Sequence, residues 1–111
     1  MQMAKATTKY VRISPRKARL AAALIRGRSV EEAATQLMYC KLRAGRLLQK
    51  TLGNAVANAE SVHNVQRRDL KVKEVRVDAG PILKRAKPKN KGGSHPIMKR
   101  TSHFTVIVAS E

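Results

Sequence analysis

Residues 80–101 of the chain read GPILKRAKPKNKGGSHPIMKRT, and this stretch decides how the rest of the sequence is interpreted. Between Pro81 and Phe104 the chain carries seven Lys and Arg residues and no Asp or Glu. Such a segment buries too little apolar surface to offset the conformational entropy that it loses on ordering. Segments with β-strand patterns flank it on both sides, so we expect a long basic hairpin that two structured strands present to a partner.

The two flanking segments predict the strands from which this hairpin extends. In residues 70–80, LKVKEVRVDAG, apolar and polar side chains alternate, but the apolar ones stand at even positions up to Val72 and at odd positions from Val75. This change predicts a β-bulge near Lys73 and Glu74. Residues 101–109, TSHFTVIVA, resume a strand pattern. The two strands should pair antiparallel, and about ten residues per arm at roughly 3.3 Å each reach on the order of 30 Å beyond the sheet. We expect the turn within residues 89–94. One face of the second strand consists of Phe104, Val106 and Val108.

A short strand and a helix are expected at the start of the chain. Residues 1–13 end in an alternation that predicts a short edge strand with Val11 and Ile13 on one face. Ser14 followed by Pro15 is typical of a helix start, because Ser caps free amides and Pro at the first position loses no hydrogen bond. This helix should run to about residue 26. Its predicted buried side consists of Ala18, Ala21, Leu24 and Ile25.

Two further helices are expected to follow. Gly27 is suited to end the first helix, since Gly readily adopts the left-handed conformation at a helix C-terminus. Ser29 and Glu32 match a capping box, in which each side chain bonds the other's backbone amide, so a second helix should cover residues 30–40. Residues 43–63 carry the longest helical pattern. Its predicted apolar face consists of Ala44, Leu48, Leu52, Ala55, Ala59 and Val62, and its predicted basic stripe consists of Arg43, Arg46, Lys50, Asn54 and Asn58.

Together these elements predict an α+β fold, with three helices packed on a small three-stranded antiparallel sheet and a long extended β-hairpin. The length of 111 residues fits a single domain. We expect a globular body formed by residues 1–80 and 101–111, and a basic hairpin formed by residues 81–100.

The charge of the chain indicates a polyanionic partner. Lys and Arg number 24 against 7 Asp and Glu, which gives a net charge of +17 and an isoelectric point near 11.2. A polyanion relieves the self-repulsion of such a protein and releases its own counterions on binding, so nucleic acid is the first candidate. A membrane surface is the weaker candidate, because no amphipathic basic helix with a large apolar face dominates. No apolar stretch approaches about 18 residues, so neither secretion nor membrane insertion is expected.

Catalytic and metal-binding patterns do not occur in the sequence. His63, His95 and His103 are isolated, and Cys40 is the single cysteine, which fits a reducing compartment and provides no paired-ligand spacing. We therefore expect no enzyme, no cofactor, no metal site and no small-molecule substrate. His103, beside Ser102 on a strand, is either a packing histidine, which is the commoner role, or a nucleic-acid contact.

Shape and backbone recognition of folded RNA fits the sequence best. Aromatic residues make up 3% of the chain and no recognition-helix or finger motif occurs, so base-by-base readout is not indicated. No acidic residue between Glu32 and Glu60 balances the basic stripe, which is either a solvated face or part of the RNA surface. The predicted RNA-binding residues are Arg12, Arg16, Lys17, Arg19, Arg43, Arg46, Lys50, Lys84, Arg85, Lys87, Lys89, Lys91, Lys99, Arg100, Ser102 and His103.

Four motifs resemble those of a known family. They are SPRKARL at residues 14–20, NAVANAE at 54–60, GPILKR at 80–85 and KRTSHFTV at 99–106. Across essentially the whole chain they are similar to the family of the twenty-second large-subunit ribosomal protein, in its compact bacterial or plastid form. The run KRTSH after a long basic segment is the most specific of the four.

The resemblance implies where such a protein acts. Its body of three helices and three strands is expected on large-subunit rRNA, beside neighbouring ribosomal proteins and near the exit of the nascent-peptide tunnel, in cytoplasmic ribosomes or in the plastid stroma. The hairpin is expected to line that tunnel. The resemblance further implies that Leu83, Lys84 and Arg85 face the nascent peptide at the constriction and influence macrolide susceptibility.

The expected tip of the hairpin departs from the family pattern. Many members carry an Arg-Ala-x-Gly-Arg run, where this chain has Lys89, Asn90, Gly92 and Gly93, so bidentate Arg contacts are not expected there. Two other classes of function stay open from the residues alone. One is a basic DNA- or RNA-architectural protein outside the ribosome, although the arm has no apolar wedge. The other is an enzyme acting on RNA, against which the lack of paired acids counts.

Overall fold

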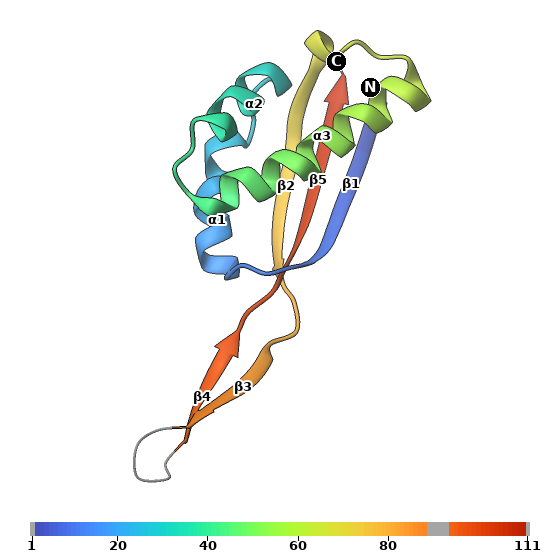
Figure 1. Cartoon of the computed structure of the whole chain (residues 1–111). Helices are drawn as coiled ribbons and strands as arrows, with labels where there is room; N and C mark the ends of the chain where they lie inside the picture. Colours follow the sequence, from blue (N-terminus) through green and yellow to red (C-terminus); the bar gives the residue numbers. More distant parts are fainter. Residues whose placement is uncertain (1, 89–93, 111) are drawn as a thin grey trace.

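Strand β5 (Ser102–Ser110) is the central strand of a three-stranded antiparallel sheet (Figure 1). The computed structural model describes residues 2–88 and 94–110 of the chain. Strands β1 (Gln2–Val11) and β2 (Leu70–Ala79) pair with the two edges of β5, in the order β1-β5-β2. The predicted three-stranded antiparallel sheet is therefore confirmed.

The face of β5 that points toward the helices forms the centre of the core. Phe104, Val106 and Val108 are fully buried there, as the alternation predicted. The register of β2 on β5 shifts between Val72 and Glu74, which confirms the predicted bulge. Because of this shift, both halves of β2 bury their apolar side chains on the same face.

Strand β1 is longer than predicted and lies earlier in the chain. The prediction placed a short strand ending at Ile13, whereas the observed strand spans Gln2–Val11 and Ile13 is buried beyond its end. The side of β1 that faces the helices carries small residues such as Ala6 and Thr8, which give only a weak apolar alternation. Tyr10 has a φ of 59°, which interrupts the strand geometry near its end. The sequence pattern therefore missed the first half of this strand.

Three helices pack on this face of the sheet: α1 (Pro15–Ile25), α2 (Val30–Met38) and α3 (Arg43–His63) (Figure 1). All three were predicted, and Gly27 ends the first with a φ of 79°. A short 3₁₀ helix, η1 (Arg67–Asp69), leads into β2. Among the described residues, no helix has both the length and the apolar character needed to cross a membrane.

Two of the predicted helix caps differ from the observed ones. Ser14 is the N-cap of α1, but its side chain makes no capping hydrogen bond. Ser29 does cap α2, because its hydroxyl accepts a hydrogen bond from the Glu32 amide at 3.3 Å. The Glu32 carboxylate does not complete the capping box, and it pairs with Arg28 at 3.8 Å instead.

Two residues predicted to be buried are exposed. Leu24 is 37% exposed, because the buried stripe of α1 passes through Ala22. Val62 is 71% exposed, because the inward side of the last turn of α3 is occupied by His63. The His63 ring reaches the neighbouring strand, where its Nε2 lies 3.2 Å from the carbonyl oxygen of Met3.

Arginines in α1 and at its C-cap cover the outer edge of β2. Arg19 donates through Nε and Nη2 to the carbonyl oxygen of Val77, at 3.3 and 3.1 Å. Arg26 donates through Nη2 to the carbonyl oxygen of Val75 at 2.8 Å. These bonds satisfy backbone acceptors that an edge strand otherwise leaves unpaired, and they block edge-to-edge association.

Side chains from α3 bond to β1, the strand at the opposite edge of the sheet. Asn58 Nδ2 donates to the carbonyl oxygen of Lys5 in β1 at 3.0 Å. Thr51 Oγ1 lies 2.8 Å from Thr8 Oγ1 of the same strand. Asn58 was predicted on the basic stripe, but its amide is a structural contact between helix and strand.

Beyond the three-stranded sheet, the chain continues as a hairpin of β3 (Leu83–Pro88) and β4 (Ser94–Lys99). These strands pair antiparallel with each other and form a separate sheet. Two hydrogen bonds join the chain where the hairpin meets the three-stranded sheet. The Gly80 amide donates to the carbonyl oxygen of Thr101 at 2.9 Å, and Thr101 Oγ1 donates to the carbonyl oxygen of Pro81 at 2.6 Å. The radius of gyration is 16.9 Å, against roughly 13 Å for a compact chain of this length. The hairpin therefore makes the molecule elongated, with extents of 62 × 25 × 16 Å (Figure 1).

Replacing Phe104 with Ala should lower the free energy of unfolding by about 3–5 kcal/mol, because it leaves a large cavity at the centre of the core. Phe104 heads the fully buried side chains by volume. Urea unfolding followed by circular dichroism measures the loss. Val62→Ala, at an exposed position, is the matched control and should change the free energy of unfolding by no more than about 0.5 kcal/mol. A loss below about 1 kcal/mol for Phe104→Ala would contradict the central place of β5 in the core.

Candidate nucleic-acid interface

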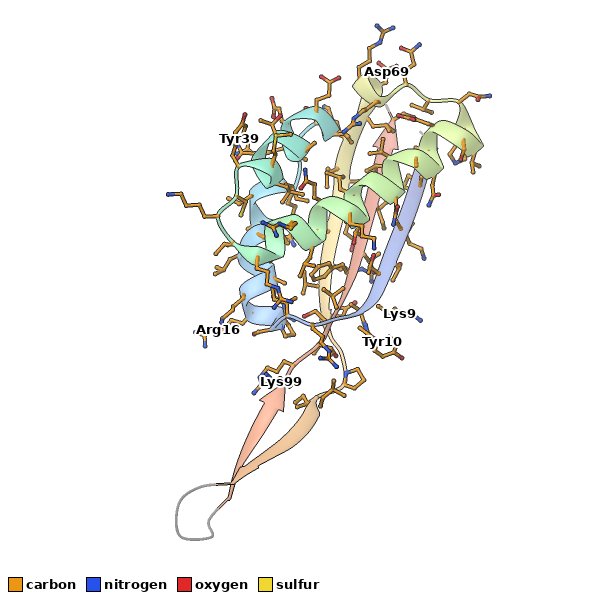
Figure 2. The ribbon with its side chains drawn as sticks, viewed as in Figure 1. Lys9, Tyr10, Arg16, Tyr39, Asp69 and Lys99 are labelled. Carbon is orange, nitrogen blue, oxygen red and sulfur yellow. The ribbon has the colours of Figure 1, made fainter. Side chains whose placement is uncertain are left out.

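A groove opens at the end of the body from which the hairpin leaves, and we call it the basic groove. It encloses about 870 Å³ and is formed by the segment before α1, the first turns of α1, the link between α2 and α3, the start of α3 and the base of the hairpin. Figure 2 shows Arg16 and Lys99 at this end of the molecule, with Asp69 at the opposite end. The residues that line the groove are Arg12, Ile13, Ser14, Lys17, Leu20, Lys41, Leu42, Arg43, Ala44, Lys99 and Arg100.

The basic groove has an unbalanced charge. Six of its lining residues are Lys or Arg, and none is Asp or Glu. Two ion pairs of the described residues, Arg28 with Glu32 at 3.8 Å and Arg76 with Glu74 at 3.4 Å, use cations outside the groove. Like charges around a concave surface with low-dielectric walls focus their potential into it. The groove is therefore a place where anions bind favourably.

Two helices begin at the basic groove, and both lack the usual negative charge at their N-termini. The N-cap residues of α1 and α3 are Ser14 and Leu42, and neither side chain makes a capping hydrogen bond. The first turns hold no acidic residue and instead carry cations, among them Lys17 and Arg43. By contrast, α2 has Ser29 as a bonded cap and two glutamates in its first turn. A cation at a helix N-terminus is unfavourable and an anion is favourable, so an external anion such as phosphate complements these two helix starts.

The fold brings five of the predicted RNA-binding residues together in the basic groove. They are Arg12, Lys17, Arg43, Lys99 and Arg100. Arg16 is exposed beside the groove on the first turn of α1. Arg46 lines a neighbouring hollow of about 280 Å³ together with three residues of the groove, Lys41, Leu42 and Arg43. Lys50 is exposed one turn further along α3.

Lys41 also lines the basic groove, and the sequence analysis missed it. It lies in the link between α2 and α3, where the sequence has no periodicity that places a residue on a face. One feature of the sequence could have identified Lys41: it lies one residue before Leu42, the N-cap of a helix that starts with Arg43. Basic residues on both sides of a helix start, without an acidic residue, indicate an anion site.

Three of the predicted RNA-binding residues serve the structure of the body. The guanidinium of Arg19 is bound to the edge of β2, as described above. Ser102 does not fit the prediction, because its side chain is fully buried and its hydroxyl donates to the carbonyl oxygen of Ile13 at 2.7 Å. His103 is half-buried, its Nδ1 accepts from the Tyr10 amide at 3.1 Å, and the two rings meet edge to face at 5.0 Å. These contacts favour the packing role of His103.

The remaining predicted residues belong to the hairpin. Leu83 and the basic residues Lys84, Arg85 and Lys87 lie on β3. Leu83 pairs with Lys99 of β4. The predicted contacts Lys89 and Lys91, and the atypical tip, lie outside the described residues, as does most of the predicted turn. Among the described residues, no three His, Cys, Asp or Glu side chains are grouped so that they could hold a metal ion.

Comparison with known proteins gives a consistent result along the chain. The family model described as Ribosomal protein L22p/L17e matches residues 6–109. The chain is 69% identical over 110 residues to the large ribosomal subunit protein uL22 of Protochlamydia amoebophila, and the match covers 99% of each protein. It is 61% identical over 106 residues to the protein of the same name from Chlamydia muridarum, covering 96% of each, and 59% identical over 109 residues to that from Chlamydia pneumoniae, covering 98% of each.

The matched residues include the helices that begin at the basic groove, all of the hairpin and the three-stranded sheet except the start of β1 and the last residue of β5. The resemblance seen in the four sequence motifs is confirmed over almost the full length. The chain therefore belongs to the ribosomal protein L22p/L17e family.

Proposed function

We propose that this chain is a structural constituent of the large ribosomal subunit that binds rRNA and supports assembly of the subunit. Its family consists of ribosomal structural proteins and not of enzymes. One observation carries the location of the RNA surface. At the basic groove, two helix starts without side-chain caps meet six cations and no carboxylate. Phosphates of rRNA supply the negative charge that these helix starts lack.

The partners and the location of the chain follow from this function. The partners of the body are large-subunit rRNA and neighbouring ribosomal proteins, and no membrane takes part. The relatives named above are chlamydial, which favours cytoplasmic ribosomes over those of the plastid stroma.

The hairpin has a separate role in this proposal. It threads between rRNA segments and lines the nascent-peptide exit tunnel, with Leu83, Lys84 and Arg85 toward the peptide. Support comes from the separate sheet of β3 and β4, which extends away from the body (Figure 1). Its sequence, with many cations and no acid, suits contact with phosphates on several sides.

The alternative is a basic architectural protein that acts on DNA or RNA outside the ribosome. It explains the charge and the extended arm equally well. It does not explain why the family match covers residues 6–109, body and hairpin together. We therefore favour the ribosomal function.

Sedimentation of cell lysate through a density gradient tests the assignment to the large subunit. The chain should co-migrate with large subunits at low salt and be released as the salt concentration is raised, because an affinity that depends on many phosphate contacts falls steeply with salt. Its recovery only in a soluble pool, or with the nucleoid, would overturn the ribosomal function.

Lys41→Gln combined with Arg43→Gln should weaken binding to large-subunit rRNA and make it less dependent on salt. The slope of log K against log salt should fall by about 1.4–1.8, since each phosphate contact contributes roughly 0.7–0.9. The variant should be at least as stable as the parent, because a cation at the start of α3 opposes the helix dipole. Filter binding over a salt series and thermal unfolding measure the two effects.

The matched control removes the same number of charges elsewhere. Arg28 and Arg76 are paired with Glu32 and Glu74, so Arg28→Gln combined with Arg76→Gln should change the salt slope by less than half as much. Equal slopes for the two double variants would show that rRNA does not use the basic groove in particular.

Deleting residues 83–85 should leave the body folded, because β2 and β5 pair up to Ala79 and Ser102 whereas β3 pairs with β4. The variant should still enter large subunits, and these subunits should respond differently to macrolides in a translation assay. A control that removes residues 87–88 and 94–95, which pair with each other, shortens the hairpin but keeps the deleted segment. Loss of the cooperative unfolding transition in the first variant would refute the separation of body from hairpin.

A further inference from the structure

The lining of the basic groove has a property that phosphate binding does not explain. Between its six cations the groove is lined by Ile13, Leu20, Leu42 and Ala44. Leu20, on α1, is 61% exposed, and Leu42, the N-cap of α3, is 42% exposed. Phosphate oxygens gain nothing from two exposed leucines, and exposing these side chains costs hydrophobic free energy. The ligand of the groove is therefore expected to have an apolar surface as well as negative charge.

The position of these leucines sets them apart from other exposed apolar residues. Single exposed apolar side chains are common on protein surfaces and need no explanation. Leu24 and Val62, for example, are exposed but are absent from the lining of the groove. Leu20 and Leu42 come from different elements and line one concave surface between cations. A concave surface lined by both apolar side chains and cations suits a ligand that has both characters.

A nucleotide taken out of the base stack combines these characters. In a double helix the bases are stacked inward and only sugars and phosphates reach a protein groove, whereas unpaired nucleotides can place the faces of their bases on protein side chains. The volume of the groove, about 870 Å³, lies within the roughly 300–1,000 Å³ typical of small-ligand pockets. A space of this size is larger than a phosphate alone requires.

We infer that the basic groove holds an unstacked nucleotide of rRNA, with its base against Leu20 and Leu42 and its neighbouring phosphates at the cations of the lining. This inference rests on the proposed function and names the RNA element that the groove recognises. The uncapped starts of α1 and α3 contribute backbone amides to the phosphates on either side of the base. An acidic peptide with an apolar side chain would meet the same two requirements, so the test has to distinguish it from RNA.

The experiment compares two RNA probes with the full-length chain. One is a short RNA duplex with a single bulged adenosine, and the other is the same duplex without the bulge. Leu20→Ala combined with Leu42→Ala should weaken binding of the bulged probe by roughly tenfold, because the apolar contacts of the base are lost while the start of α3 stays without a side-chain cap. Binding of the paired probe and the salt slope of both should stay as in the parent, because no charge changes.

Leu24→Ala combined with Val62→Ala is the matched control. It replaces two exposed apolar residues outside the basic groove and should leave the affinity for both probes unchanged. Circular dichroism verifies that each variant is folded. The inference is overturned if the groove variant weakens both probes equally or neither of them. It is also overturned if a leucine-containing acidic peptide, and not the bulged probe, loses affinity in that variant.

Failure of this inference and failure of the proposed function give different results. If the parent chain neither sediments with large subunits nor binds large-subunit rRNA, the proposed function is wrong. If the parent binds rRNA but is insensitive to the leucine substitutions, the rRNA function stands and the groove contacts the backbone alone.

Discussion

The pairing of β5 with both β1 and β2 is the constraint on which the rest of the molecule depends. Because β2 and β5 are antiparallel neighbours, the chain between Ala79 and Ser102 must leave the sheet and return at the same point. The residues just before that return are Lys99 and Arg100, which line the basic groove together with the starts of α1 and α3. The same pairing thus creates the hairpin, fixes its base on the body and supplies one wall of the groove.

The basic groove illustrates how a binding surface is built at a cost to stability. In α2 the bonded cap and the two glutamates of the first turn complement the helix dipole. In α1 and α3 the same positions carry no acidic residue and several cations. Each of these helix starts is therefore less stable than one with a bonded cap and acidic residues would be. A phosphate bound at such a helix start interacts favourably with the helix dipole and with the cations, so it stabilises the helix start in the complex. Local departures from good capping are therefore informative about function.

How much the sequence predicted depended on the physical signal available at each place. The limits of α3, Arg43–His63, were predicted because its apolar residues repeat at helical steps over 21 residues. The first half of β1 was not, since it buries small residues such as Ala6, and a small side chain gives little contrast with its polar neighbours. The groove was predicted as a set of cations but not as a concave surface, because its residues come from separate segments. Ser102 was misassigned, since no local pattern shows that its hydroxyl bonds the carbonyl oxygen of Ile13.

The net charge of +17 does not correspond to an equal number of contacts with phosphate. Arg19 and Arg26 bind carbonyl oxygens at the edge of β2, where a planar guanidinium can reach and satisfy backbone acceptors. Arg28, in the link between α1 and α2, donates through Nε to the carbonyl oxygen of Leu24 at 2.7 Å and lies near Glu32. These arginines protect the sheet and the helix ends whether or not RNA is present. The six cations of the basic groove have no carboxylate beside them in its lining, and the partial charges of two helix starts add to theirs. The distribution of charge, more than its total, makes this end of the body suited to a polyanion.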